Sequence, residues 1–293
     1  MDTIKNISII FTSIFFESLP FLILGSLISA IIETFVSNEQ IAKLIPKNKI
    51  LGSVVGVILG FFLPACDCAV IPVSKRLLKK KVPVNVAISF MLASPIINPV
   101  VLLSTYYAFY NPNPKIFWYR LIFGIIIALL IGIIMGIIFD KKEVVVNLDD
   151  ECDCHEHEEN NKFLSIVKHT AFDAFDVVKY LMFGAILASL VQVILPRSVL
   201  TLFNNNKVLE IITLMLFAYL ISLCSTSDSF VGKSLLSTFS TGSIMAYLLL
   251  GPMIDIKNTI VLLGNYKKSF VLSLISFIFI IIFIFSLIIV RFL

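Results

Sequence analysis

Two cysteine thiols flank a carboxylate at Cys66-Asp67-Cys68, inside a long apolar stretch of the chain. If that stretch crosses a membrane, the carboxylate costs several kcal/mol, so it should face a cavity, pair with a cation or carry a proton. Thiolates are soft ligands that suit metal ions and metalloids. Pro64 removes a backbone donor and predicts a helix break beside the thiols. The alternative, a capping turn with small buried cysteines, explains Asp67 poorly.

Three further polar interruptions occur in apolar stretches. Residues 223–229 hold a thiol, four hydroxyls and a carboxylate. A surface loop is the alternative there, because Ser and Thr also bond back to helix carbonyls. Residues 93–99 and 250–255 each combine a small residue and a proline with an amide or acid, for which a plain proline kink is the alternative. The residues predicted to bind a shared ligand are Cys66, Asp67, Cys68, Ser94, Asn98, Cys224, Ser225, Asp228 and Asp255.

Two carboxylates are candidates for carrying a coupling proton or ion. Glu17 lies in the middle of the first apolar stretch, and Asp67 lies at the thiol break. Buried ionisable groups inside membrane segments mark ion pathways and proton relays.

A Cys/His-rich segment of different composition separates the two halves of the chain. Residues 149–159 hold seven carboxylates, two thiols and two imidazoles, and they show no apolar periodicity. The segment is therefore expected to be an exposed loop. Its Cys152, Cys154, His155 and His157 could capture zinc, copper or a thiophilic metalloid, although they lack the spacing of a folded zinc site. An acidic solubilising linker is the alternative.

Amino-acid composition indicates which kind of structural element positions these thiols and carboxylates. Of the 293 residues, 58% are hydrophobic and only 14% are charged, against about 45–50% and about 25% in a soluble domain. Apolar runs long enough to cross a bilayer, about 20 residues each, predict an all-α polytopic membrane protein with eight spans. The runs cover 7–32, 50–74, 82–110, 121–139, 180–196, 211–227, 234–254 and 269–290.

An internal repeat organises these spans. Residues 17–25 align with 176–184, residues 66–78 with 224–236, and residues 94–98 with 251–255, at offsets of 159, 158 and 157. The matched positions are mostly polar, Gly, Pro or Cys, and they keep their order. The sequence therefore predicts two homologous membrane halves, 1–139 and 170–293, joined by a linker at 140–169, with broken helices meeting at a central site.

The relative orientation of the halves depends on the number of spans. Four spans in each half would place the halves parallel, and the charge distribution mildly favours that arrangement. An odd number would invert the second half, for instance if a broken segment folds back as a re-entrant hairpin.

Residues 64–72, a basic turn and residues 90–98 resemble the predicted-permease family that includes the organoarsenical permease ArsP and the YraQ-type proteins. Members share Pro-x-Cys-Ser-Cys followed by Pro, then Ala-(Ser/Thr)-Pro in the next helix. The resemblance implies membrane transport, with paired thiols at Cys66 and Cys68. Asp67 replaces the family's usual Ser, which suits a cationic or proton-coupled cargo rather than a direct copy of the arsenical substrate.

The expected function is a secondary permease or efflux protein for a metal ion or metalloid compound. A membrane thiol enzyme, or a scaffold or channel subunit whose Cys/His linker binds metal or a partner, is the alternative. The expected surroundings are a lipid bilayer, a small-molecule or ion cargo and, for any direct coupling to ATP, a partner subunit. We expect no nucleic acid, no catalytic residues and no cofactor beyond a metal at the linker. The expected location is the bacterial plasma membrane.

Overall fold

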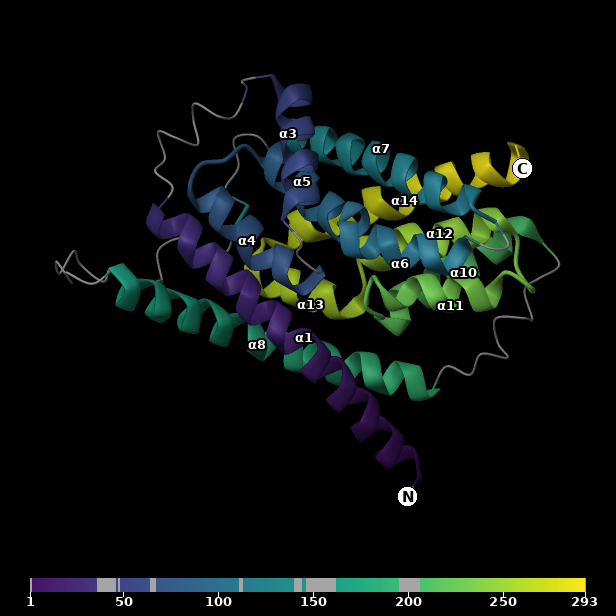
Figure 1. Cartoon of the computed structure of the whole chain (residues 1–293), viewed down its shortest axis with the longest axis horizontal. Helices are drawn as coiled ribbons and strands as arrows, with labels where there is room; N and C mark the ends of the chain where they lie inside the picture. Colours follow the sequence, from purple (N-terminus) through teal and green to yellow (C-terminus); the bar gives the residue numbers. More distant parts are fainter. Residues whose placement is uncertain are drawn as a thin grey trace.

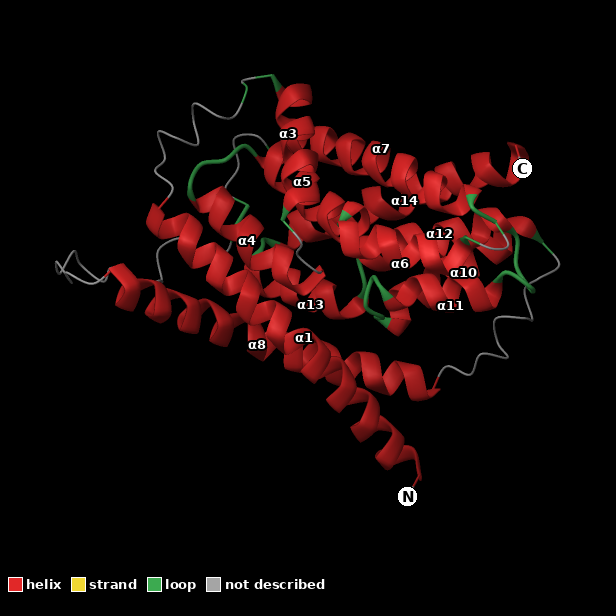
Figure 2. Ribbon diagram, viewed as in Figure 1, coloured by secondary structure: helices red, strands yellow, loops and turns green. Residues whose placement is uncertain are grey.

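The computed structural model describes residues 2–35, 46, 48–63, 67–110, 113–139, 144–145, 162–194 and 206–292. Within these ranges the chain is helical, apart from turns and an isolated β-bridge between Val145 and Tyr266 (Figures 1 and 2). The helices are α1 (Asp2–Phe35), α3 (Lys49–Phe62), α4 (Asp67–Lys79), α5 (Val84–Ile97), α6 (Pro99–Phe109), α7 (Lys115–Ile138), α8 (Lys162–Ile194), α10 (Lys207–Ile221), α11 (Ser227–Leu235), α12 (Thr241–Met253), α13 (Ile256–Asn265) and α14 (Lys268–Phe292).

Six helical stretches in the described ranges are long and apolar enough to cross a membrane. They are Ile4–Ile28, Val84–Phe109, Lys115–Ile138, Val177–Ile194, Thr241–Asn265 and Lys268–Arg291. The predicted spans at 50–74 and 211–227 are not among them. The first divides into α3 and α4, and α3 has 14 residues, which rise only about 21 Å against a bilayer core of about 30 Å. The count of eight therefore treated two short helices as full spans.

The α3–α4 segment folds back on itself. Along α3, Gly52 lies against Asn85 and Gly60 against Ser94, so α3 runs parallel to α5. A tight turn after α4 leads directly into the start of α5, so α4 returns in the opposite direction. The hairpin is held to α5 at its tip, where the Ser94 hydroxyl donates to the Leu63 carbonyl at 3.2 Å.

The α10–α11 segment has the same shape. The Glu210 side chain contacts the backbone of Ser240 at the start of α12. About two turns further along both helices, the Phe217 ring packs on Tyr247, so α10 and α12 run parallel. Helix α11 returns antiparallel to α12, with Gly232 beside Leu248 and Asp228 beside Gly251. Each half of the chain therefore has a helical hairpin whose tip reaches a broken helix.

Helices α7 and α14 run in opposite directions. The Phe139 ring packs on Phe270, and the Phe123 ring packs on Phe285, so α7 and α14 are antiparallel. Helix α7 is in turn antiparallel to α5, and α14 to α12, because Gly132 lies against Ser89 and Gly242 against Ser286. It follows that α5 and α12 also run in opposite directions.

Helices α1 and α8 pack against each other through Ile14, Ala185 and Ala188, and they cross one side of the bundle together (Figure 1). Helix α1 lies on α4, where Gly25 touches Ala69. Helix α8 lies on α13, where Gly184 touches the backbone of Lys257. This pair of helices covers the region in which the hairpin tips meet the broken helices.

Two parts of the expected linker at 140–169 are described by the structure. Helix α8 begins at Lys162, inside the expected linker at 140–169. Val144 and Val145 are also buried, and the Val144 carbonyl accepts from the Lys267 amide at 2.9 Å. The start of the segment is thus attached to the second half, because its two valines can bury apolar surface, which the acidic residues after them cannot.

Close packing of α3 on α5 gives a first testable prediction. A Cβ added at Gly56 would lie 2.4 Å from the Val86 carbonyl oxygen, which is backbone and cannot turn aside. Gly56→Ala should destabilise the protein by about 1–3 kcal/mol, measured by thermal unfolding in detergent. Gly232→Ala is the control, since its nearest neighbour at 3.1 Å is the movable Leu248 side chain. Equal losses in the two variants would contradict the packing argument.

Candidate functional site

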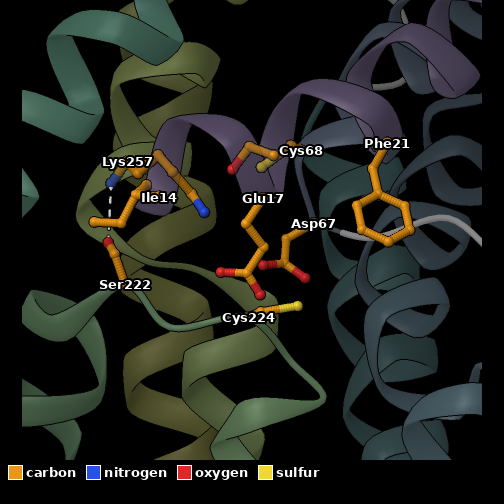
Figure 3. A pocket seen from close by; sticks show the side chains of 9 residues that line it. Ile14, Glu17, Phe21, Asp67, Cys68, Ser222, Cys224 and Lys257 are labelled. Carbon is orange, nitrogen blue, oxygen red and sulfur yellow. Dashed lines mark hydrogen bonds between the residues drawn. The ribbon is translucent and has the colours of Figure 1, made fainter. Parts of the chain in front are cut away.

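A cavity of about 20 Å³ lies where the two halves meet under α1. Its walls come from α1, the first turn of α4, the segment after α10 and the start of α13 (Figure 3). The polar lining consists of Glu17, Ser18, Asp67, Cys68, Ser222, Cys224 and Lys257. We call it the thiol cavity, because it combines one thiol from each half with two carboxylates and an ammonium group.

Asp67 is the first residue of α4 and is only 4% exposed. Lys257 is the opposite charge that acts most strongly on it, and Figure 3 shows the Lys257 side chain directed toward Asp67 and Glu17. The Asp67 Oδ1 atom has no hydrogen-bond partner among the described residues. A buried carboxylate that faces a cation and a cavity is what the sequence predicted, although the cation itself was missed.

The thiols differ in exposure. Cys68 is buried, whereas Cys224 is partly exposed to the thiol cavity and its Sγ lies 3.4 Å from the Thr226 hydroxyl. Cys66 lies outside the described residues. The structure therefore brings Asp67, Cys68 and Cys224 to one cavity, while their role in binding a ligand stays a prediction.

Asn98 and Asp255 occupy the two helix breaks. The Asn98 side chain accepts from the Val100 amide at 3.0 Å and caps α6. The Asp255 side chain accepts from the Asn258 amide at 2.6 Å and caps α13. Side-chain caps satisfy the orphan amides of a helix start, which explains why an amide or an acid follows each proline. These two side chains thus stabilise the breaks. Asp255 also lies beside Lys257 of the thiol cavity, whereas Asn98 is not among the described residues that line the cavity.

The other predicted residues have different surroundings. The Ser94 hydroxyl holds the α3 tip, as described above, and Ser225 contributes its backbone carbonyl to Arg120 at 3.4 Å. Asp255 Oδ2 is 3.8 Å from the Lys257 ammonium. Glu17 is exposed on α1 at the wall of the thiol cavity. The linker residues Cys152, Cys154, His155 and His157 lie outside the described residues.

Arg120 and Asp228 form a buried cluster that sequence reasoning did not assemble. Arg120 is fully buried in α7 and donates to the hydroxyls of Thr105 and Ser229, each at 2.7 Å. Asp228 interacts electrostatically with Arg120 and accepts from the Tyr247 hydroxyl at 3.0 Å. The cluster joins α6 and α7 of the first half to α11 and α12 of the second half.

Arg120 and Lys257 were missed because each resembles a flanking residue in the sequence. Arg120 immediately precedes the apolar run at 121–139, where a basic residue ordinarily anchors a span at the interface. Lys257 follows Asp255 by two residues, at what was taken as the end of a span. The one available signal was that Asp67, Asp228 and Asp255 need compensating cations if they are buried.

Among the described residues, no group of three or more His, Cys, Asp or Glu side chains is placed to hold a metal ion. The arrangement is instead an open site with two thiols, two carboxylates and one cation. Such a site can bind a cationic ligand by competition with Lys257, and it can release that ligand because it is not a closed cage.

Several long apolar helices, two of them broken at Asn98 and Asp255, are typical of polytopic membrane permeases. Comparison with known protein families and sequences agrees with this class. A family model described as a predicted permease, ArsP_1, matches residues 3–290. The chain belongs to this family, and the six helices in its described ranges that are long and apolar enough to cross a membrane are consistent with a multi-pass bacterial membrane protein.

Two relatives cover almost the whole chain. One is the "Putative two-component membrane permease complex subunit" of Streptococcus mutans, 38% identical over 91% of this chain and 89% of its own length. The other is the UPF0718 protein YcgR of Bacillus subtilis, 39% identical over 93% of each chain. No solved structure matches the chain.

Proposed function

We propose that this permease is a secondary transporter for a thiophilic cation, either a metal ion or a metalloid compound. The observation that carries the proposal is the pairing of Cys68 and Cys224, one from each half, in a cavity that also holds Asp67 and Glu17. Thiolates select soft metals and metalloids, and the carboxylates favour positive charge. Lys257 offsets part of this negative charge when no cargo is bound, and a cationic cargo displaces its ammonium group.

The two halves are an inverted repeat in this proposal. Three observations support it: the antiparallel packing of α7 on α14, the re-entrant shape of α3–α4 and α10–α11, and three apolar spans on each side of the linker. The halves of an inverted repeat are related by a pseudo-two-fold axis in the membrane plane. They can exchange their conformations, and the exchange exposes a central site to alternate sides of the membrane. The helix breaks at Asn98 and Asp255 are the joints at which α5–α6 and α12–α13 change angle.

A partner subunit is part of the proposal. The name of the Streptococcus mutans relative describes it as one subunit of a two-component permease complex, and this chain is similar to it over most of its length. A membrane thiol enzyme fits less well, because a cysteine nucleophile needs a base and the described lining of the thiol cavity contains no histidine.

Transport in proteoliposomes tests the function. The purified full-length protein should move Zn²⁺, Cu⁺ or a trivalent organoarsenical, and it should bind that cargo in preference to Mg²⁺ or an organic anion of similar size. An excess of a small dithiol should suppress uptake of the soft cargo, since it competes for the same coordination. Transport of Mg²⁺ or of the organic anion, with no transport of any soft cargo, would overturn the assignment.

A further inference from the structure

A second cavity, of about 10 Å³, shares Asp67 with the thiol cavity. It is built where α12 ends and α13 begins, and Pro252, Met253 and Asn258 line it together with Asp67. Met91 of α5 closes another side. The cavity therefore lies between the broken helix of the second half and the first turn of α4 from the first half.

Two residues that line this cavity each carry a buried oxygen with no hydrogen-bond partner among the described residues. Asn258 is 3% exposed, and its Oδ1 has no partner among the described residues. The Oδ1 atom of Asp67 is in the same condition. An unpartnered buried acceptor costs about 1–3 kcal/mol, and buried polar atoms in native structures nearly always have a partner, a water or an ion. Two such acceptors on residues of one small cavity suit a ligand that is a cation or a hydrogen-bond donor.

The helix break adds further oxygens. The last four carbonyls of a helix have no intrahelical partner, and the carboxyl end of α12 lies at Pro252 and Met253. Carbonyls at a helix end carry partial negative charge. Unwound carbonyls and half-helix carboxyl ends are the groups that coordinate Na⁺ in transporters with broken helices.

We propose that this cavity binds a sodium ion, coordinated by Asp67 Oδ1, Asn258 Oδ1 and carbonyl oxygens at the end of α12. The ligands are all hard oxygens, which favour sodium over the soft metals that thiols select. Asp67 is the one carboxylate in the described lining, and it already faces the charge of Lys257, so a monovalent ion fits the charge better than a divalent one.

Asp67 belongs to both cavities, and this shared position gives the sodium site a function. A sodium ion on one side of the carboxylate fixes its orientation toward the thiol cavity and adds positive charge that weakens the attraction between Asp67 and Lys257. Lys257 is then easier for a cargo to displace. This coupling rests on the proposed function, whereas the sodium site itself depends only on the second cavity.

Thermal unfolding of the purified full-length protein tests the site without any metal or metalloid cargo. Sodium chloride is titrated against choline chloride at constant ionic strength. Wild type should show a saturable rise in Tm of about 5 °C, as expected for a ligand well above its Kd. Potassium chloride should give a smaller rise, because the cavity is small.

Variants at Asn258 separate binding from folding. Asn258→Leu should abolish the sodium-dependent rise, and Asn258→Asp, which keeps an oxygen at the same place, should retain it. Asn265→Leu is the control: Asn265 lies on the same helix and is equally buried, but its side-chain amide already donates to the Val261 carbonyl at 2.8 Å. This control should keep the full rise even if its starting Tm is lower.

The absence of a saturable sodium effect in wild type would overturn the proposal, as would an unchanged effect in Asn258→Leu. The outcome is independent of the cargo assignment. A sodium effect lost in Asn258→Leu, in a protein that transports no soft metal or metalloid, would leave the sodium site standing and remove the proposed function. Transport of a soft metal or metalloid by a protein that shows no sodium effect would remove the sodium site and leave the proposed function standing.

Discussion

Arg120→Met should destabilise the folded protein by about 3–6 kcal/mol, because it removes two hydrogen bonds from a charged group, each of which contributes about 1.5–3 kcal/mol. The substitution removes both short hydrogen bonds to Thr105 and Ser229 and leaves Asp228 buried without its cation. Methionine keeps much of the side-chain volume, so a cavity contributes little to the loss. Chemical unfolding in detergent micelles measures the change.

Two companion variants identify the cause of that loss. Asp228→Asn in the Arg120→Met background should restore much of the stability, because the uncompensated charge is gone. Arg291→Met is the control, since Arg291 is exposed near the end of α14, and it should change stability by less than about 0.5 kcal/mol. If the double variant is no more stable than Arg120→Met alone, the charge argument is wrong and the hydrogen bonds explain the effect.

Cys68→Ser and Cys224→Ser should each reduce transport of a soft cargo about tenfold, which corresponds to about 1.4 kcal/mol of binding free energy. Each change keeps the shape of the side chain and removes the soft ligand. Uptake per folded molecule in proteoliposomes is the measurement, and Cys224→Ser is the cleaner test because Cys224 is partly exposed to the cavity.

Stability separates this prediction from its structural alternative. If the thiols only fill space, serine at the buried Cys68 position should cost about 1–3 kcal/mol through an unpartnered hydroxyl, with transport per folded molecule intact. Asp67→Asn then distinguishes a cargo site that depends on charge from one that depends only on thiols. A site that depends on charge should lose cation transport, whereas a site that depends only on thiols should tolerate the amide. Unchanged transport in all three variants would remove the thiol cavity as the cargo site.

The sequence alone located the helix breaks, since proline and the residue after it act through local geometry. Proline cannot donate to the preceding turn, and an amide or acid a few residues later can cap the next helix. The structure confirms that α5 ends before Asn98 and that α12 ends before Asp255. The membrane class follows from composition in the same way, because an apolar excess of this size cannot be buried in a soluble fold.

The number of spans and the partners of the buried charges were decided by tertiary structure. Whether an apolar run crosses the bilayer or returns as a hairpin depends on what its tip contacts, as with Ser94 and Leu63. Arg120 meets Ser229 across 109 positions of sequence, and Ser74 meets Tyr266 across 192.

Local patterns carry no information about such distant contacts. Arg120 and Lys257 therefore looked like ordinary interface residues, although the fold buries both as internal cations, Lys257 at the thiol cavity and Arg120 in the cluster with Asp228. The sequence determined which carboxylates, thiols and prolines are unusual for a membrane segment. Only the packing of one half against the other decided which cation each carboxylate faces, because that depends on helices brought together from opposite ends of the chain.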